Sequence, residues 1–123
     1  MAARSALIIL DHGSRRPEAH EHLERLAEQV RRRAPALFVL TAHLEQAEPT
    51  LAQAVERCAA EGVREIAVHP LFLAPGRHLA HDIPEQLAAL RRARPELEIR
   101  LLDALGERSE LADLILATLA PPS

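Results

Sequence analysis

The 123-residue sequence contains one cysteine, no tryptophan, no tyrosine and only two phenylalanines. A lone Cys58 excludes an intrachain disulfide, a CxxC redox pair and a zinc cage built from thiolates. Because 48% of the residues are hydrophobic and few of them are aromatic, we expect an aliphatic core that needs no disulfide. Cys58 is expected to pack inside that core.

Lysine is also absent, and the formal net charge is −3. This balance gives no reason to expect binding to nucleic acid or to an acidic membrane surface. The N-terminal apolar run over residues 6–10 stops at Asp11, which makes it too short for a signal peptide, and no stretch is long enough to span a bilayer. The sequence therefore predicts a cytoplasmic protein.

Short apolar runs alternate with amphipathic segments along the chain. Strands are predicted at 6–10, 37–40, 66–68 (with a continuation toward 73) and 99–102. Helices are predicted over 19–30, between Pro49 and Gly62, after the capping-box pair Asp82 and Glu85, and over 111–119. This order predicts an α/β three-layer sandwich, in which a four-stranded parallel sheet carries helices on both faces. Residues 1–123 are expected to form a single domain.

Reactive side chains follow the predicted strands. In open parallel sheets, ligands bind beyond the carboxyl ends of the strands. Histidine and carboxylate ligands suit divalent iron, cobalt, nickel and zinc. The side chains come from separate loops, and there are no cysteines to complete a four-ligand structural site. We therefore predict an open metal site that exchanges its ion, and not a structural one. The potential ligands at this edge are His12, His43, Glu45, His78 and His81.

Three segments after predicted strands carry a resemblance to a known family. They are Asp11-His12-Gly13-Ser14-Arg15, Ala42-His43-Leu44-Glu45-Gln46-Ala47-Glu48-Pro49, and Pro70 to His78 followed by Asp82-Ile83-Pro84. In this order they resemble the short-form sirohydrochlorin chelatases of the CbiX and SirB type, which have a class II chelatase-like fold. The resemblance covers essentially the whole chain.

The resemblance implies a homodimeric enzyme that inserts a divalent metal into a sirohydrochlorin-type tetrapyrrole, for siroheme or cobalamin-type cofactors. His12 and His78 match the two histidines that hold the incoming metal, and Glu45 matches the acidic residue beside them. These three are the expected catalytic residues. The metal, Fe²⁺, Co²⁺ or Ni²⁺, is then a substrate, and no permanently bound cofactor is expected.

The chemistry of metal insertion fits these residue types. The ion must shed water and the macrocycle must lose two pyrrolic protons. A neutral imidazole can ligate the metal and can also accept a proton, and a carboxylate can do either. The carboxylates around the rim of sirohydrochlorin are expected to pair with Arg15 and Arg77. Further substrate contacts are expected from Gly13, Ser14, Leu44 and Gly76.

Some positions depart from the commonest family pattern, in which glycine stands at position 11 and an aromatic residue at position 43. Asp11 and His43 are more similar to cyanobacterial and plant members, which suggests iron as the metal. The role of His43 is open between a hydrogen-bonding partner behind the metal ligands and a third ligand.

Ordinary structural roles are expected for the remaining histidines and for one acid. His20, His22 and His81 are expected to be solvent-exposed, and His69 is expected to be packed in the third strand. Asp82 is expected to act as a helix cap.

Two other functions compete with a chelatase. The His-Gly pair after a strand is also found in histidine phosphatases, but those sites need an arginine where Asp11 stands, and a negative charge there disfavours phosphate. A carrier of metal or tetrapyrrole would use the same edge of the sheet without turnover. Catalytic turnover distinguishes that carrier from an enzyme.

Overall fold

The computed structural model describes residues 4–74 and 76–121, apart from the side chains of His78 and Leu79. Strands and helices alternate along the chain. They are β1 (Ser5–Asp11), α1 (Pro17–Arg33), β2 (Phe38–His43), α2 (Leu51–Ala60), β3 (Glu65–Pro70), α3 (Arg77–Ala93), β4 (Glu98–Leu101), the 3-10 turn η1 (Leu105–Glu107) and α4 (Glu110–Ala117).

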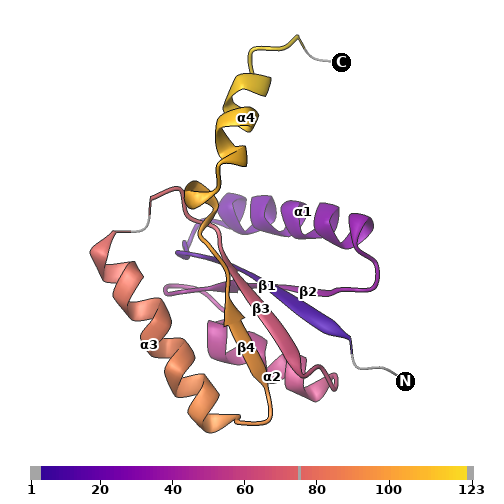
Figure 1. The fold of residues 1–123 in the computed structure, drawn as a ribbon, viewed down its shortest axis with the longest axis vertical. Coiled ribbons are helices and arrows are strands. Elements are labelled where there is room, and N and C mark those ends of the chain that lie inside the picture. The colour runs from indigo at the N-terminus through magenta and orange to yellow at the C-terminus, as the bar shows by residue number, and fades with distance from the viewer. Residues whose placement is uncertain (1–3, 75, 122–123) are drawn as a thin grey trace.

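The four strands form one parallel sheet in the order β2-β1-β3-β4. α1 lies on one face of the sheet, and α2 and α3 lie on the other (Figure 1). Successive residues of β1 point to opposite faces, so Ile8 packs with Leu87 of α3, whereas Ile9 packs with Leu23 of α1. The predicted parallel α/β sandwich is confirmed.

The core is aliphatic, as the composition predicts. Its largest fully buried side chains include Ile8, Leu10 and Leu51. Cys58 is fully buried among them, and burial raises the pKa of its thiol to about 11. The expectation that Cys58 packs in the core is confirmed.

Two helices begin where the sequence did not predict. α3 begins at Arg77 because Gly76, in an extended conformation, supplies its N-cap, so Asp82 and Glu85 lie inside the helix and form no capping box. A capping box is found at α2, where the Thr50 hydroxyl accepts from the Gln53 amide and the Gln53 side chain accepts from the Thr50 amide. Pro49 therefore precedes α2 and is not in its first turn.

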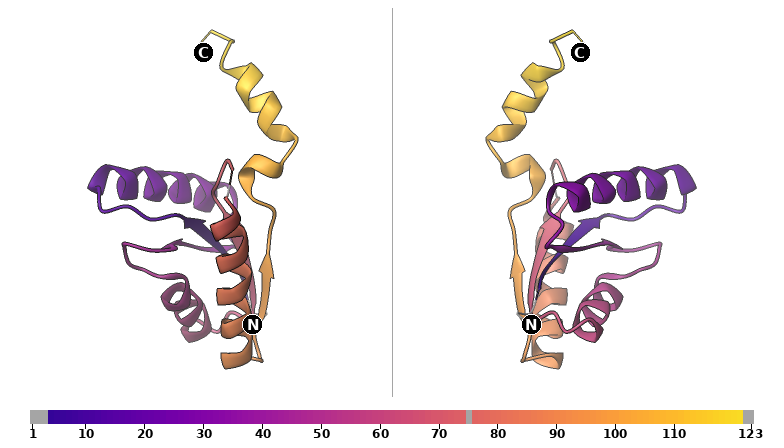
Figure 2. Two further views of the ribbon diagram at one scale, coloured as in Figure 1. Left: turned by 90° about the vertical axis from the view of Figure 1, so that its left-hand side faces the viewer. Right: turned by 90° about the vertical axis from the view of Figure 1, so that its right-hand side faces the viewer.

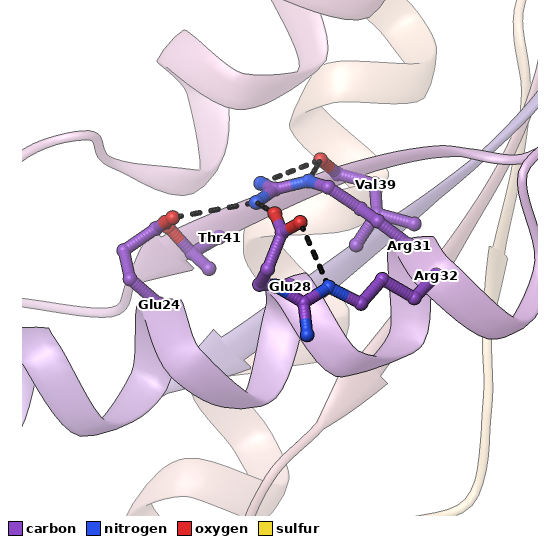
Figure 3. Close-up of polar contacts among 6 residues, drawn as sticks. All are labelled: Glu24, Glu28, Arg31, Arg32, Val39 and Thr41. Atoms are coloured by element: carbon purple, nitrogen blue, oxygen red, sulfur yellow. Dashed lines mark hydrogen bonds and ion pairs between the residues drawn. The ribbon is translucent and has the colours of Figure 1, made fainter.

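Arginines from two helices bind backbone oxygens of the edge strands. Arg31 of α1 donates from Nε and Nη2 to the carbonyl of Val39 in β2, at 3.2 and 3.0 Å (Figure 3). Arg91 of α3 makes the same pair of bonds to Ile99 in β4, at 2.9 and 2.6 Å. Edge carbonyls are a template for unwanted strand pairing, and these guanidinium groups occupy one on each edge.

The C-terminal helix differs from the other three. α4 points away from the sheet, beyond the carboxyl ends of the strands (Figures 1 and 2). None of its eight residues is buried. In the described ranges, 4–74 and 76–121, no helix has the length and apolar character that a membrane crossing requires.

Candidate metal-handling site

Pairing between β1 and β2 continues past the ends of both strands. Asp11 lies opposite His43 in the last matched pair of the ladder. The Leu44 amide then donates to the Asp11 carbonyl at 2.9 Å, and the Glu45 amide donates to the His12 carbonyl at 3.1 Å. The two loops that follow these strands are therefore held side by side.

This backbone pairing brings His12 and Glu45 together at the carboxyl edge of the sheet. His12 Nε2 lies 2.8 Å from Glu45 Oε1, and each side chain is 51% exposed. Two ligand atoms about 2.1 Å from one ion and at right angles stand about 3 Å apart. A divalent ion can thus reach both atoms from solvent with little movement of either.

The third predicted ligand comes from another part of the edge. His78 lies in the first turn of α3, but its side chain is outside the described residues. Among the residues whose side chains are described, no group of three histidine, cysteine or acidic residues is placed to hold a metal ion. In the described part of the site, His12 and Glu45 are thus the two predicted ligands that lie in contact with each other.

His43 lies beneath this edge and not on it. Its Nδ1 donates to Asp11 Oδ1 at 2.6 Å, and the two side chains are 4% and 20% exposed. Both residues point toward α1, because they alternate with the residues that point toward α2 and α3. This burial favours a positioning role for His43 over direct binding of an ion that arrives from solvent.

His20 is half-buried, and the prediction that it is solvent-exposed is wrong. Its ring lies against that of His43, with 4.8 Å between centroids. Its Nε2 donates to the carbonyl oxygen of Ser14, in the loop that carries His12. Pro17 is the sequence feature that could have predicted this contact. A proline is common at the first residue of a helix, and α1 does begin at Pro17, so His20 lies in the first turn, beside the loop.

His22 and His81 are exposed as expected, whereas His69, which was expected to be packed, is only partly covered. His81 pairs with Glu85 at 3.5 Å. His69 is half-buried in β3, where burial lowers the pKa of its imidazole.

Gly13 is required by the packing of the two loops. Its φ is +105°, and a Cβ built there would lie 1.7 Å from the carbonyl oxygen of Glu45. Only glycine permits both this backbone conformation and this approach. Gly13 therefore allows the loop of His12 to lie directly against the loop of Glu45.

The predicted substrate contacts are in different surroundings. Arg15 is exposed beside the His12 loop, and Gly76 and Arg77 are exposed at the first turn of α3. Ser14 is half-buried, and its hydroxyl accepts from the Arg16 amide at 3.0 Å. Leu44 is half-buried and packs against the main core, so only part of it can meet a ligand.

The CbiX family model matches residues 6–121, a range that extends from the second residue of β1 past the end of α4. The chain belongs to the CbiX family. Among curated relatives it is 34% identical to the chloroplastic sirohydrochlorin ferrochelatase of Arabidopsis thaliana, over 89% of this chain and 48% of that protein. It is 31% identical to the sirohydrochlorin cobaltochelatase of Methanosarcina barkeri, over 94% of both chains.

A solved structure supports the fold. The sirohydrochlorin chelatase SirB of Bacillus subtilis, in complex with cobalt, matches with a TM-score of 0.82 and 28% identity. The match covers 94% of this chain and 50% of the SirB chain. This CbiX-family chain thus spans about half the length of several relatives that it matches, and almost the whole of the Methanosarcina barkeri protein.

Replacing Gly13 with alanine tests the packing of the two loops. We expect Gly13→Ala to lower the free energy of unfolding by at least about 2 kcal/mol, because of the positive φ and the clash with Glu45. Gly76→Ala is the control, since nothing lies within 4 Å of a Cβ there, and its cost should stay below about 1 kcal/mol. Urea unfolding measures both, and equal costs would contradict the close approach.

Two substitutions of His43 test its positioning role. His43→Asn keeps an N–H group near the place of Nδ1 and can still donate to Asp11, whereas His43→Leu cannot. We expect the leucine variant to lose about 1–3 kcal/mol of stability and to bind Co²⁺ more weakly than the asparagine variant. Urea unfolding and calorimetric titration with Co²⁺ measure the two effects. Equal Co²⁺ affinity in the two variants would contradict a role for the Asp11 bond in the site.

Proposed function

We propose that the protein is a sirohydrochlorin metal chelatase, with residues 1–123 as one chelatase-like domain that acts in the cytoplasm. The observation that carries the proposal is the close pair of His12 and Glu45, half-exposed on the carboxyl edge of the sheet in a CbiX-family chain. Such a pair can take an ion from solvent and release it again. The substrates are a divalent metal ion and a sirohydrochlorin-type tetrapyrrole.

Binding of the ion uses His12 Nε2 and Glu45 Oε1, with His78 as the third ligand from the start of α3. An imidazole and a carboxylate are suitable ligands for Fe²⁺, Co²⁺ and Ni²⁺. Few protein ligands and an open position keep the ion exchangeable, whereas a structural site closes around its metal with four. Weak binding is an advantage here, because the ion must pass to the macrocycle.

Proton transfer balances the reaction. As a divalent ion enters the macrocycle, two pyrrolic N–H groups each lose a proton, so the charge of the ring system is unchanged. Once the ion leaves His12 and Glu45, the imidazole nitrogen and the carboxylate are both free to accept a proton. The same two side chains thus hold the metal before transfer and can receive protons after it.

The macrocycle is held through its carboxylates. Arg15 stands beside the His12 loop, and Arg77 begins α3. The first turn of α3 contains no acidic residue, so its free backbone N–H groups face an incoming carboxylate without a competing negative charge. The backbone of Gly13 and Ser14, Gly76 and the exposed part of Leu44 complete the proposed contact surface.

Iron and cobalt are both compatible with this site. The Arabidopsis thaliana relative is named a ferrochelatase, and the Methanosarcina barkeri relative is named a cobaltochelatase. A site of histidine and carboxylate ligands follows the general order of affinity for divalent metals. In that order Fe²⁺ binds more weakly than Co²⁺ and Ni²⁺. The supply of each metal therefore decides which one is inserted. Iron stays a prediction from the residues at positions 11 and 43.

We also propose that the working form is a homodimer. One four-stranded sheet offers a single wall to a macrocycle, and relatives such as SirB carry about twice the matched length in one chain. A second copy of this chain would supply the other half.

Substitution of the proposed ligands tests the activity. With limiting enzyme, anaerobic sirohydrochlorin and Co²⁺, we expect His12→Ala, His78→Ala and Glu45→Gln each to lower kcat/KM by about 100-fold or more. His22→Ala is the matched control, because His22 is exposed on α1, and it should retain full activity. Circular dichroism checks that each variant is folded.

The same assay separates an enzyme from a carrier. Repeated turnover above the rate with metal alone supports a chelatase, and comparison of Fe²⁺, Co²⁺ and Ni²⁺ gives the preferred metal. Binding of sirohydrochlorin at one equivalent without turnover would replace the proposal with a carrier. Wild-type rates in the His12 variant would overturn the ligand assignment.

A further inference from the structure

His20 lies on the face of α1 that rests on the sheet, and two other residues of this face hold the helix to β2. Arg31 donates to the carbonyl oxygen of Val39 at 3.2 and 3.0 Å, and the Thr41 hydroxyl donates to Glu24 Oε1 at 2.8 Å (Figure 3). Residues four apart share a face of a helix, so His20 lies one turn before Glu24 on the same face. The first turn of α1 is thus held in position by contacts that do not involve His20.

His20 contacts two segments that belong to the metal-handling site. Its ring lies against that of His43, at the end of β2, with 4.8 Å between centroids and 32° between the ring planes. Its Nε2 donates to the carbonyl oxygen of Ser14. A carbonyl oxygen can only accept, so this bond requires the proton on Nε2, and in a neutral ring Nδ1 is then the acceptor nitrogen. One side chain of α1 therefore reaches both the loop after β1 and the end of β2.

The Ser14 carbonyl belongs to a short loop that contains a glycine. Gly13 lies between His12 and Ser14, and a glycine has more backbone freedom to lose than any other residue. The loop is held on one side by the Glu45 amide, which donates to the His12 carbonyl at 3.1 Å. The bond from His20 holds it on the other side, two residues further on. The backbone that carries His12 is thus fixed at both of the carbonyl oxygens that flank Gly13.

We propose that His20 is a positioning residue of the metal-handling site, whose N–H group fixes the loop of His12 so that the His12 imidazole stays beside Glu45. His20 acts through the backbone of Ser14, and its Nε2 carries a proton in this bond and cannot ligate the ion. This inference rests on the proposed function, because the two ligands that it positions are those of the proposed chelatase. It deepens that function by assigning part of the support of the site to α1.

The ring and the N–H group of His20 are two separate means of support, and substitutions distinguish them. His20→Gln keeps an N–H group at about the same reach as Nε2 but has no ring. His20→Met is similar in length and shape to the glutamine variant and has neither the N–H group nor the ring. His20→Phe keeps a ring against His43 but cannot donate to Ser14. The proposal assigns the support to the N–H group.

Calorimetric titration of the full chain with Co²⁺ alone measures the effect. We expect His20→Met and His20→Phe each to bind Co²⁺ about 10-fold more weakly than the wild type, because loss of a group that orients a metal ligand costs about 10-fold or more in affinity. His20→Gln should restore most of this affinity. The matched controls are His22→Met and His22→Phe, since His22 is exposed on the same helix, and both should leave the affinity unchanged.

A role in packing alone would give a different ranking of the variants. If the ring only fills space between α1 and β2, His20→Phe binds Co²⁺ as the wild type does, whereas the glutamine and methionine variants are equally weak. That ranking would overturn the proposal. Circular dichroism checks that each variant is folded. The comparison needs His20→Gln and only one of the two variants without the N–H group, so a single variant that fails to fold does not prevent the test.

Replacement of His12 separates a failure of this inference from a failure of the proposed function. If His12→Ala loses Co²⁺ binding while His20→Met and His20→Phe retain it, His20 has no positioning role and the chelatase proposal stands. If His12→Ala binds Co²⁺ as tightly as the wild type, both proposals are overturned, because His20 acts through His12.

Discussion

Two backbone hydrogen bonds beyond β1 and β2, from Leu44 to Asp11 and from Glu45 to His12, extend the parallel pairing into the loops. The rest of the site depends on this extension. It brings His12 and Glu45 side by side, and it requires a glycine at position 13 where the loops meet. A site built on a sheet ladder is more rigid than one built on free loops.

The alternation of side chains along a strand separates two histidine–carboxylate pairs. Asp11 and His43 point toward α1 and form a buried hydrogen-bonded pair, whereas His12 and Glu45, which lie in the following loops, reach solvent at the edge. Burial makes the first pair a fixed support, since a broken hydrogen bond there would leave polar atoms without water. Exposure keeps the second pair accessible to an ion.

Three features could be predicted from the sequence: the strand and helix pattern, the parallel sheet, and the position of His12 and Glu45 at its carboxyl edge. They depend on local residues, since apolar runs mark the strands and ligands bind beyond the carboxyl ends of parallel strands. The contact of the His20 ring with His43 could not be predicted, since it depends on how α1 lies over β1 and β2. The bonds from Arg31 and Arg91 to the edge strands could not be predicted either, because they appear only when the strand order is known.

The most direct test of the account is the position of a bound ion. Crystals of the protein soaked with Co²⁺ under anaerobic conditions, with diffraction data collected at the cobalt absorption edge, would locate the metal. The account predicts an anomalous peak within bonding distance of both His12 Nε2 and Glu45 Oε1. A peak at His69 and Asp103, or at any place that excludes the His12–Glu45 pair, would contradict it.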